Sequence, residues 1–328
     1  MRALVTGGTG FIGSHLVDRL VKDGHSVVVP VRKSSDRKYL SSEGADIREA
    51  DLLDGAATGA LMKNVDIVFH LAAIRGSGWT HDDTQIRRVN VELTRNLLDR
   101  SARGNVSRFI YISSVSVFGH PYGGPVAEDS PCFPATRYGK TKYDSEALVT
   151  EFHRNRNVPG IVIRPVITYG PRDTWGMIPK LVRLIDSGRY LTVGSGENRV
   201  HLLYIDDLIE GIMRSVDSPA APGSTYVFSG MEPVTVNRLV DLISSALGKR
   251  VPPFHVPLKA VRIAGHLLET AHRVLGLDRE PFLTPDKIDI MCRDRFFSHE
   301  RARDELGFDP RTDCGTGIGI TVKWLNAA

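Results

Sequence analysis

The sequence predicts an α/β fold in which a doubly wound parallel sheet carries helices on both faces and a smaller C-terminal lobe follows. In the first 165 residues, short runs of β-branched and apolar residues alternate with helical patterns, which is typical of βαβ units. The strand runs are almost wholly apolar, as expected for strands that are buried on both faces. A glycine-rich turn separates the first strand run from the first helical pattern.

The predicted elements follow in order along the chain. Strands at 3–6, 27–31, 65–70, 109–112 and 161–163 alternate with helical patterns that include 14–22 and 90–100. After Pro165, glycine and proline pairs break the chain into shorter pieces, which indicates the start of the second lobe.

A helical pattern at 204–215 and a strand run at 225–229 suggest that the chain returns once to the sheet. We therefore predict a first domain over 1–168 and a second lobe over 169–328, of which about 201–230 returns to the first domain.

Length, composition and charge exclude several classes of protein. A chain of 328 residues has room for about two domains. With 41% hydrophobic and 24% charged residues it has the balance of a folded protein. Its 42 Lys and Arg against 38 Asp and Glu leave a net charge of +4 without a long basic run, so no nucleic-acid partner is predicted.

The cysteines and the apolar runs predict a cytoplasmic protein without a metal. Cys132, Cys292 and Cys314 form no Cys-x-x-Cys pair, so neither a disulfide framework nor a zinc site is indicated. The first residues lack the pattern of a signal peptide, and no apolar run approaches the ~18 residues of a membrane span.

A basic amphipathic pattern at 258–277 has two interpretations. Such a helix can lie on a membrane surface, or it can pack its apolar face onto the second lobe. We favour packing, because such helices are common in globular proteins.

The glycine-rich turn at 6–13 reads Thr-Gly-Gly-Thr-Gly-Phe-Ile-Gly and predicts a dinucleotide site. Glycines let backbone N–H groups approach a pyrophosphate and let the helix pack closely on the strand, and the helix N-terminus attracts the negative charge. The order strand, turn, helix is that of a Rossmann domain. The residues expected to bind the dinucleotide here are Gly7, Gly10, Phe11, Ile12 and Gly13.

The end of the second strand favours NADP(H) over NAD(H). An acidic side chain there would bind the ribose 2′-hydroxyl of NAD, but this strand runs into Arg32 and Lys33, and the first carboxylate is Asp36. Two cations favour a 2′-phosphate, although two solvated surface cations are the alternative. NAD(H) therefore stays the second choice.

Tyr138 and Lys142 stand four residues apart, so their side chains lie on one face of the predicted helix. A tyrosine with a pKa near 10 needs a shift of ~3 units to exchange a proton at neutral pH, and a neighbouring ammonium can supply much of it. Ser113 and Ser114 end the strand at 109–112, at the sheet edge where ligands bind. Together these residues predict acid–base chemistry at a substrate oxygen.

With these motifs the chain resembles the extended short-chain dehydrogenase/reductase family, also described as the NAD-dependent epimerase/dehydratase group. The resemblance extends over essentially the whole chain, including the motifs Tyr-Gly-Lys-Thr-Lys at 138–142, His-Leu-Ala-Ala at 70–73 and Tyr-Ile-Asp-Asp at 204–207. It implies a catalytic trio of Ser114, Tyr138 and Lys142, with Ser113 as second choice for the hydroxyl. It also implies a substrate-binding C-terminal lobe and a homodimer formed by helices of the first domain.

The resemblance further implies the rest of the cofactor site. Asp51 and Leu52 would meet the adenine, Leu71 to Ala73 would line the ribose and the pyrophosphate, and Lys142 would also bind the nicotinamide ribose. The cofactor-binding residues implied in this way are Asp51, Leu52, Leu71, Ala72, Ala73, Tyr138, Lys142 and Pro165.

Departures from the family's other motifs reduce the number of reactions expected of this chain. Sugar dehydratases carry Asp-Glu where this chain has Val115 and Ser116, which cannot eliminate water. Sugar-nucleotide members tend to have an asparagine in place of Ile167 and an Arg-Asp pair in place of 200–201. Arg199 is displaced by one residue, which in a strand turns it to the other face.

What remains is similar to the branch of 3β-hydroxysteroid dehydrogenases and ketone reductases, whose substrates are largely apolar. Candidate walls for such a pocket are Trp79, Trp175, Met177 and Ile178. The leading hypothesis is hydride transfer between NADP(H) and a secondary alcohol or ketone as small-molecule substrate. A nucleotide-sugar epimerase with the same trio is the first alternative, and a dinucleotide-sensing protein without chemistry is the second.

Overall fold

The computed structural model describes residues 1–40, 43–75, 82–120, 124–252, 254–275 and 292–327, together with residues 277, 281, 284 and 288. The described helices are α1 (Phe11–Lys22), α2 (Gly55–Leu61), α3 (Asp83–Arg87), α4 (Leu93–Gly104), α5 (Arg137–Arg156), α6 (Met177–Asp186), α7 (Ile205–Asp217), α8 (Val236–Leu247), α9 (Leu258–Val274), α11 (Glu300–Leu306) and α12 (Cys314–Ala327). A π-helical turn covers Arg88–Glu92 and a 3-10 turn covers Val115–Phe118.

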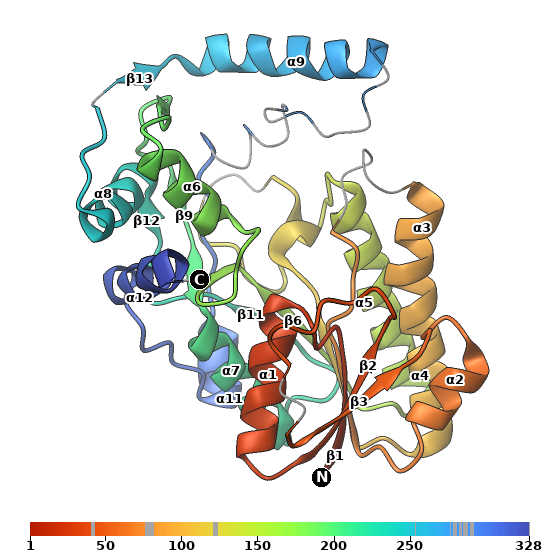
Figure 1. Ribbon diagram of the computed structural model, residues 1–328. Coiled ribbons are helices and arrows are strands. Elements are labelled where there is room, and N and C mark those ends of the chain that lie inside the picture. Colours follow the sequence, from red (N-terminus) through yellow and green to blue (C-terminus); the bar gives the residue numbers. More distant parts are fainter. Residues whose placement is uncertain are drawn as a thin grey trace.

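A seven-stranded parallel sheet forms the centre of the first lobe (Figure 1). Its strands, in spatial order, are β11 (Thr225–Phe228), β6 (Gly160–Pro165), β5 (Arg108–Ile112), β4 (Ile67–His70), β1 (Arg2–Thr6), β2 (Ser26–Val31) and β3 (Ala45–Glu49). Every neighbouring pair is parallel, so the predicted doubly wound α/β class is confirmed.

Both faces of the sheet are covered by helices, as the apolar strand runs predict. In β1, Ala3 and Val5 pack into the core on one face and Leu4 into the core on the other, all fully buried. Figure 1 shows α1, α7 and α11 on one side of the sheet and α2 to α5 on the other. The carboxyl ends of the strands lie toward the second lobe (Figure 1).

The second lobe is built from helices and short strand pairs. Parallel pairs join β7 (Ile167–Tyr169) to β10 (Leu202–Tyr204) and β8 (Thr192–Val193) to β13 (His255–Val256), and an antiparallel pair joins β9 (Arg199–Val200) to β12 (Val234–Thr235). Between these pieces the chain returns to the first lobe, where α7 packs on α1 and β11 pairs with β6. None of the described helices is long and apolar enough to span a bilayer.

Helix α9 corrects one prediction. The helix forms, but the favoured packing of its apolar face holds only in part: Val261 of that face is buried, whereas Leu268 and Leu275 are 41% and 69% exposed. Ile263, Leu267 and Val274 have exposed fractions of 63%, 66% and 80%. In Figure 1, α9 runs across the top of the molecule, away from the central sheet. The side of α9 that carries Val261 and Gly265 therefore contacts the rest of the protein.

Candidate active site

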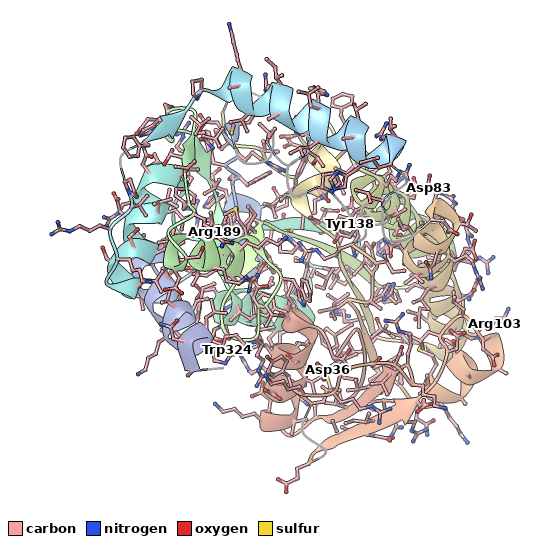
Figure 2. All side chains as sticks on the ribbon, turned by 45° about the horizontal axis from the view of Figure 1, so that its top comes forward. Asp36, Asp83, Arg103, Tyr138, Arg189 and Trp324 are labelled. Carbon is pink, nitrogen blue, oxygen red and sulfur yellow. The ribbon has the colours of Figure 1, made fainter. Side chains whose placement is uncertain are left out.

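A cavity of about 2280 Å³ lies between the carboxyl ends of the central strands and the second lobe. Pockets for small molecules commonly measure ~300–1,000 Å³, so this cavity has room for a dinucleotide and a second molecule. Tyr138 on α5 and Arg189 after α6 face it from the two lobes (Figure 2). All residues predicted for catalysis or cofactor binding line it: Gly7, Gly10, Phe11, Ile12, Gly13, Arg32, Lys33, Asp51, Leu52, Leu71, Ala72, Ala73, Ser114, Tyr138, Lys142 and Pro165.

The glycine turn forms a cradle that side chains would fill. Gly7 has φ of +72°, and a Cβ there would lie 2.8 Å from the backbone nitrogen of Ala72. A Cβ on Gly13 would lie 2.2 Å from the carbonyl oxygen of Gly7, so α1 packs directly on the turn. No side chain of the described residues caps α1, which begins at Phe11 beside the cavity. The N–H groups of its first turn therefore suit an anionic ligand such as a pyrophosphate.

The sheet edge beyond β2 carries charges of both signs. Arg32 and Lys33 line the cavity, and so do Glu49 at the end of β3 and Asp51. One oxygen of Asp51 accepts a hydrogen bond from the backbone of Leu53 at 2.9 Å, so this carboxylate also shapes the local turn. This edge accordingly offers a ligand two cations and two carboxylates.

The loop at 71–75 is held in place by Asn90. The side chain of Asn90 accepts from the backbone N–H of Ile74 at 2.7 Å and donates to the carbonyl of Ile74 at 3.0 Å. It also donates to the Thr141 hydroxyl on α5 at 2.9 Å. Asn90 therefore ties this cavity-lining loop to the helix that carries Tyr138 and Lys142.

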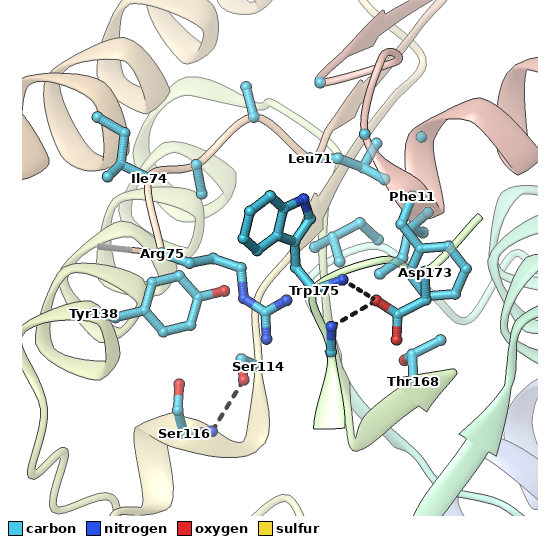
Figure 3. Close-up of a pocket in the computed structure, with 18 of the residues that line it drawn as sticks. Phe11, Leu71, Ile74, Arg75, Ser114, Ser116, Tyr138, Thr168, Asp173 and Trp175 are labelled. Atoms are coloured by element: carbon cyan, nitrogen blue, oxygen red, sulfur yellow. Dashed lines mark hydrogen bonds between the residues drawn. The ribbon is translucent and has the colours of Figure 1, made fainter. Parts of the chain in front are cut away.

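Two serine hydroxyls lie at the end of β5. Ser114 caps the 3-10 turn and accepts from the backbone N–H of Ser116 at 3.2 Å, which leaves its own proton for another acceptor. Ser113 is buried, and its hydroxyl has no hydrogen-bond partner among the described residues. Both line the cavity, and Figure 3 shows Ser114 and Tyr138 on one side of it, around the guanidinium of Arg75.

The pKa of Tyr138 corrects another prediction. Burial raises this pKa above its ordinary value, and the nearby Arg75 lowers it only in part. Lys142 does not supply the expected lowering, because its amine donates to the Ile112 carbonyl at 2.6 Å and lies 5.9 Å from the Tyr138 ring centre. Burial also lowers the pKa of Lys142 to about 7, so the amine carries only part of its charge at neutral pH. Without a bound ligand, the phenol is therefore a poor acid.

Arg75 and Asp173 also line the cavity, although no sequence motif pointed to them. Asp173 is buried, and one of its oxygens accepts from the backbone N–H of Gly176 at 2.8 Å. Its other oxygen has no partner among the described residues, and burial raises the pKa of this carboxyl. Arg75 lies next to Tyr138 in Figure 3 and lowers the pKa values of both Tyr138 and Asp173. The site therefore holds a cation and a carboxyl besides the predicted trio.

The four predicted pocket walls have different outcomes. Trp175 and Met177 line the cavity. Ile178 does not line it and is fully buried in the core, because it lies on the inner face of α6. Trp79 lies outside the described residues. Arg199 does not line the cavity either, as its shifted position predicts.

A dinucleotide cradle at the end of a parallel sheet, with a tyrosine and a lysine one helical turn apart, defines a nicotinamide-dependent enzyme. The chain belongs to the NAD dependent epimerase/dehydratase family, whose model matches residues 3–228. This family includes extended short-chain dehydrogenases/reductases, so the resemblance drawn from the motifs is confirmed.

The relatives include both reductases and epimerases. The 2-alkyl-3-oxoalkanoate reductase of Stenotrophomonas maltophilia is 29% identical, with 97% of each chain covered. The UDP-glucose 4-epimerase of Mycolicibacterium smegmatis is 30% identical, with 99% of this chain and 98% of the relative covered. A 3β-hydroxysteroid dehydrogenase/Δ5→4-isomerase of Mycobacterium tuberculosis is 30% identical over 94% of this chain and 86% of its own length.

A solved structure has the same fold. The UDP-glucuronic acid 4-epimerase of Bacillus cereus, in complex with NAD, is 24% identical and superposes with a TM-score of 0.81 over 100% of this chain and 99% of that one. The chain is thus an enzyme of a family that works with a nicotinamide cofactor.

Proposed function

We propose that the protein interconverts a secondary alcohol and a ketone on a largely apolar substrate, with Ser114, Tyr138 and Lys142 as its catalytic residues. The observation that carries this proposal is that the Ser114 hydroxyl, the Tyr138 hydroxyl and the glycine cradle border one cavity with room for two molecules. The bound nicotinamide dinucleotide supplies or accepts the hydride.

The chain's own groups handle the proton and the substrate oxygen. In reduction, Tyr138 gives its proton to the developing alkoxide while Ser114 donates a hydrogen bond to the same oxygen. The raised pKa of Tyr138 keeps the phenol protonated at neutral pH before a substrate binds. Lys142 would hold the ribose side of the cofactor, and its amine lies 5.9 Å from the centre of the Tyr138 ring. In oxidation the proton moves the other way.

Replacing Tyr138 by phenylalanine tests this mechanism. Tyr138→Phe removes the proton donor but keeps the ring, so it should lower kcat about 100-fold or more, the usual contribution of general acid–base catalysis. The melting temperature and the affinity for the dinucleotide should stay near those of the wild type. Full activity in the variant would contradict the assignment.

We further propose NADP(H) as the preferred cofactor, because Arg32 and Lys33 line the cavity at the ribose edge. Fluorescence titrations with NADPH and NADH should give a lower Kd for NADPH, and Arg32→Ala with Lys33→Ala should remove the difference. Lys38→Ala, on an exposed lysine outside the cavity, is the control. Equal or tighter binding of NADH by the wild type would refute the preference.

A nucleotide-sugar epimerase is the second candidate, supported by the UDP-glucose 4-epimerase relative of 30% identity. The same trio would then oxidise and re-reduce one carbon, with no net change in the absorbance of the reduced nicotinamide. Incubation with UDP-glucose and analysis of the sugar product separates this reaction from net reduction of a ketone.

A further inference from the structure

A short extended segment after residue 293 brings Arg295 to the substrate side of the cavity. The segment bridges Val200 of β9, and the backbone N–H of Arg295 donates to the Arg199 carbonyl at 2.9 Å. Two residues on, the N–H of Phe297 donates to Nδ1 of His201 at 3.1 Å. Since side chains alternate along an extended segment, Arg295 and Phe297 both line the cavity, while Phe296 packs under the guanidinium of Arg199.

His201 fixes this segment. Its Nδ1 accepts from Phe297, and its Nε2 therefore carries the proton and donates to the Gly230 carbonyl at 3.0 Å. Burial lowers the pKa of His201 to about 4, so the ring stays neutral and the tautomer does not change near neutral pH. The backbone at Arg295 is thus held by its own bond to Arg199 and by the bond from Phe297 to His201.

Unlike Arg199 and Arg164, Arg295 forms no ion pair with a described residue. Arg199 pairs with Asp294 at 3.1 Å, and Arg164 pairs with Glu146 at 2.7 Å. Among the described residues, no carboxylate or carbonyl accepts from the Arg295 side chain, and this residue is only partly exposed. Burial lowers its pKa, and no acid among the described residues opposes that effect. A cation in this position is costly unless an anion pairs with it.

We propose that Arg295 binds an anionic group of the substrate. The second-lobe part of the cavity is lined by further cations, Lys180, Arg183 and Arg189, against the carboxyl of Asp173. Apolar residues that line the same cavity include Val256, Val261 and Phe297. This combination fits an apolar molecule that carries an acid group away from its reacting carbon. The proposal rests on the proposed function and names its substrate class as oxo or hydroxy acids with an apolar chain.

Arg295 also places a cation at the cavity wall, which Arg199 does not. Arg199 faces Asp294 outside the cavity, whereas Arg295 reaches the cavity from the neighbouring segment. A cation at this wall is therefore present even though the Arg-Asp pair of sugar-nucleotide relatives is absent. Both a carboxylate and a phosphoryl group would suit a guanidinium, and the experiment has to separate them.

Calorimetric binding in the presence of NADP⁺ tests Arg295 without any turnover. Dodecanoate, its methyl ester and UDP are titrated into the wild type, Arg295→Gln, Arg295→Lys and the control Arg199→Gln. The wild type should bind dodecanoate more tightly than the ester. Arg295→Gln should raise the Kd of dodecanoate about tenfold or more, which is ~1.4 kcal/mol, and should leave the ester unchanged. Arg295→Lys should recover part of the affinity, and Arg199→Gln should match the wild type.

The outcomes distinguish this proposal from the proposed function. If UDP rather than dodecanoate depends on Arg295, the anion site stands but holds a phosphoryl group, and the ketone reductase proposal fails. If Tyr138→Phe is fully active while dodecanoate binding depends on Arg295, only the mechanism fails. Equal losses for acid and ester, or no loss for any anion, would overturn the anion site. The melting temperature of Arg295→Gln shows whether the variant is folded.

A second inference rests on α9, independently of the cavity. At about 100° per residue, the exposed Ile263, Leu267 and Val274 lie within about 40° of arc, opposite the buried Val261 and Gly265. Leu268 and Leu275, 41% and 69% exposed, lie about 120° and 100° from the centre of this face, on the side of Val261. Helices of a folded protein normally turn such a face inward, so the face indicates an apolar contact outside the chain.

The charges of α9 lie along one border of that face. Lys259, Arg262, His266 and Arg273 fall within about 60° of arc, and all are exposed. The helix has one acidic residue, Glu269, which pairs with Arg273 at 2.5 Å. An apolar face bordered by cations is the pattern of a helix that lies in the interface of an anionic bilayer.

We propose that α9 binds the surface of anionic lipid membranes with its outward apolar face. Val261, on the inner edge of the helix, lines the cavity. Membrane binding through α9 would therefore bring the substrate lobe close to the lipid, where apolar substrates partition. The charge complementarity favours lipid over a second copy of this basic helix, whose cations would meet their like.

Vesicle co-sedimentation tests this proposal on the full chain. Vesicles of phosphatidylglycerol and phosphatidylcholine should sediment the wild type, and binding should fall in 0.5 M salt, which shortens the screening length to a few ångströms (about 3 Å at 1 M). Ile263→Ser with Leu267→Ser should reduce binding about tenfold or more, whereas Met231→Ser, on an apolar residue that is 56% exposed elsewhere, should not. Equal binding to pure phosphatidylcholine, or a dimer that dissociates in the double variant, would overturn it.

Discussion

At the scale of single residues, Lys142 is a buried amine whose charge costs the folded chain stability. It is 2% exposed, and its amine donates to the Ile112 carbonyl and lies 4.6 Å from the Tyr111 ring centre. Burial is the main reason why its pKa falls to about 7, against the opposing effect of Glu146. An unfolded lysine has a pKa of about 10.4. The folded chain therefore holds this proton less tightly than the unfolded chain does.

This difference predicts a pH-dependent stability. Between pH 7 and about 10.4 the unfolded chain binds a proton that the folded chain lacks, so the free energy of unfolding rises with pH by up to ~1.4 kcal/mol per unit. Below pH 7 Lys142 is protonated in both the folded and the unfolded chain, so the full cost of burying its charge remains. Lys142→Met should therefore be more stable than the wild type at pH 6, and its advantage should shrink as the pH rises to 10.

Urea unfolding at several pH values measures the effect. Lys140→Met, which removes an exposed lysine on the same helix, is the control and should give a curve parallel to that of the wild type. A difference between wild type and Lys142→Met that stays constant from pH 6 to pH 10 would contradict the lowered pKa.

At the scale of elements, a buried ion pair joins α5 to β6. Arg164 donates to both oxygens of Glu146, at 3.0 and 2.7 Å, and to the Glu128 carbonyl at 3.1 Å. Both side chains are nearly buried, with exposed fractions of 8% and 7%. Glu146 follows Lys142 by one helical turn, so this pair also helps to hold the catalytic face of α5 against the sheet.

Breaking this pair on one side should be costly. Arg164→Met leaves the Glu146 carboxylate buried and unpaired, which should lower the free energy of unfolding by ~3–5 kcal/mol. Arg164→Met combined with Glu146→Leu should recover most of the loss. Arg87→Met, which breaks the exposed pair with Asp144, should cost no more than ~1 kcal/mol. Urea unfolding of the wild type and these three variants checks this, and a double variant no better than Arg164→Met would argue against it.

Among the strands and helices, some could be predicted from the sequence and others could not. Buried strands such as β1 and β4 were predictable because their runs are apolar on both faces. β3 escaped notice, because this edge strand reads Ala-Asp-Ile-Arg-Glu and is half exposed. In α9 the sequence pattern indicates an apolar face on the side of Val261, but the exposed Ile263, Leu267 and Val274 on the opposite side were not predicted. Arg295 was not predictable, since its place in the cavity depends on a bridge to Val200, which is 95 residues away.

At the scale of the whole molecule, the two lobes are not independent halves of the chain. After forming β7, the chain builds α6 in the second lobe and then returns with α7 and β11 to the first. Arg19 on α1 pairs with Glu210 on α7 at 3.0 Å, and Arg172 pairs with Asp18 on α1 at 2.7 Å. The face of α1 that carries these contacts is thus covered by residues beyond 168.

A fragment of residues 1–168 should therefore fail to fold as a stable unit, although it contains the glycine cradle and the trio. It lacks β11, so the β6 edge of the sheet would be open to other chains, and it lacks the helix that covers α1. The full chain should unfold in one transition by circular dichroism and tryptophan fluorescence, whereas the fragment should aggregate or show no cooperative transition. A monomeric fragment that melts cooperatively and binds the dinucleotide would show that the first lobe does not need the returning segment.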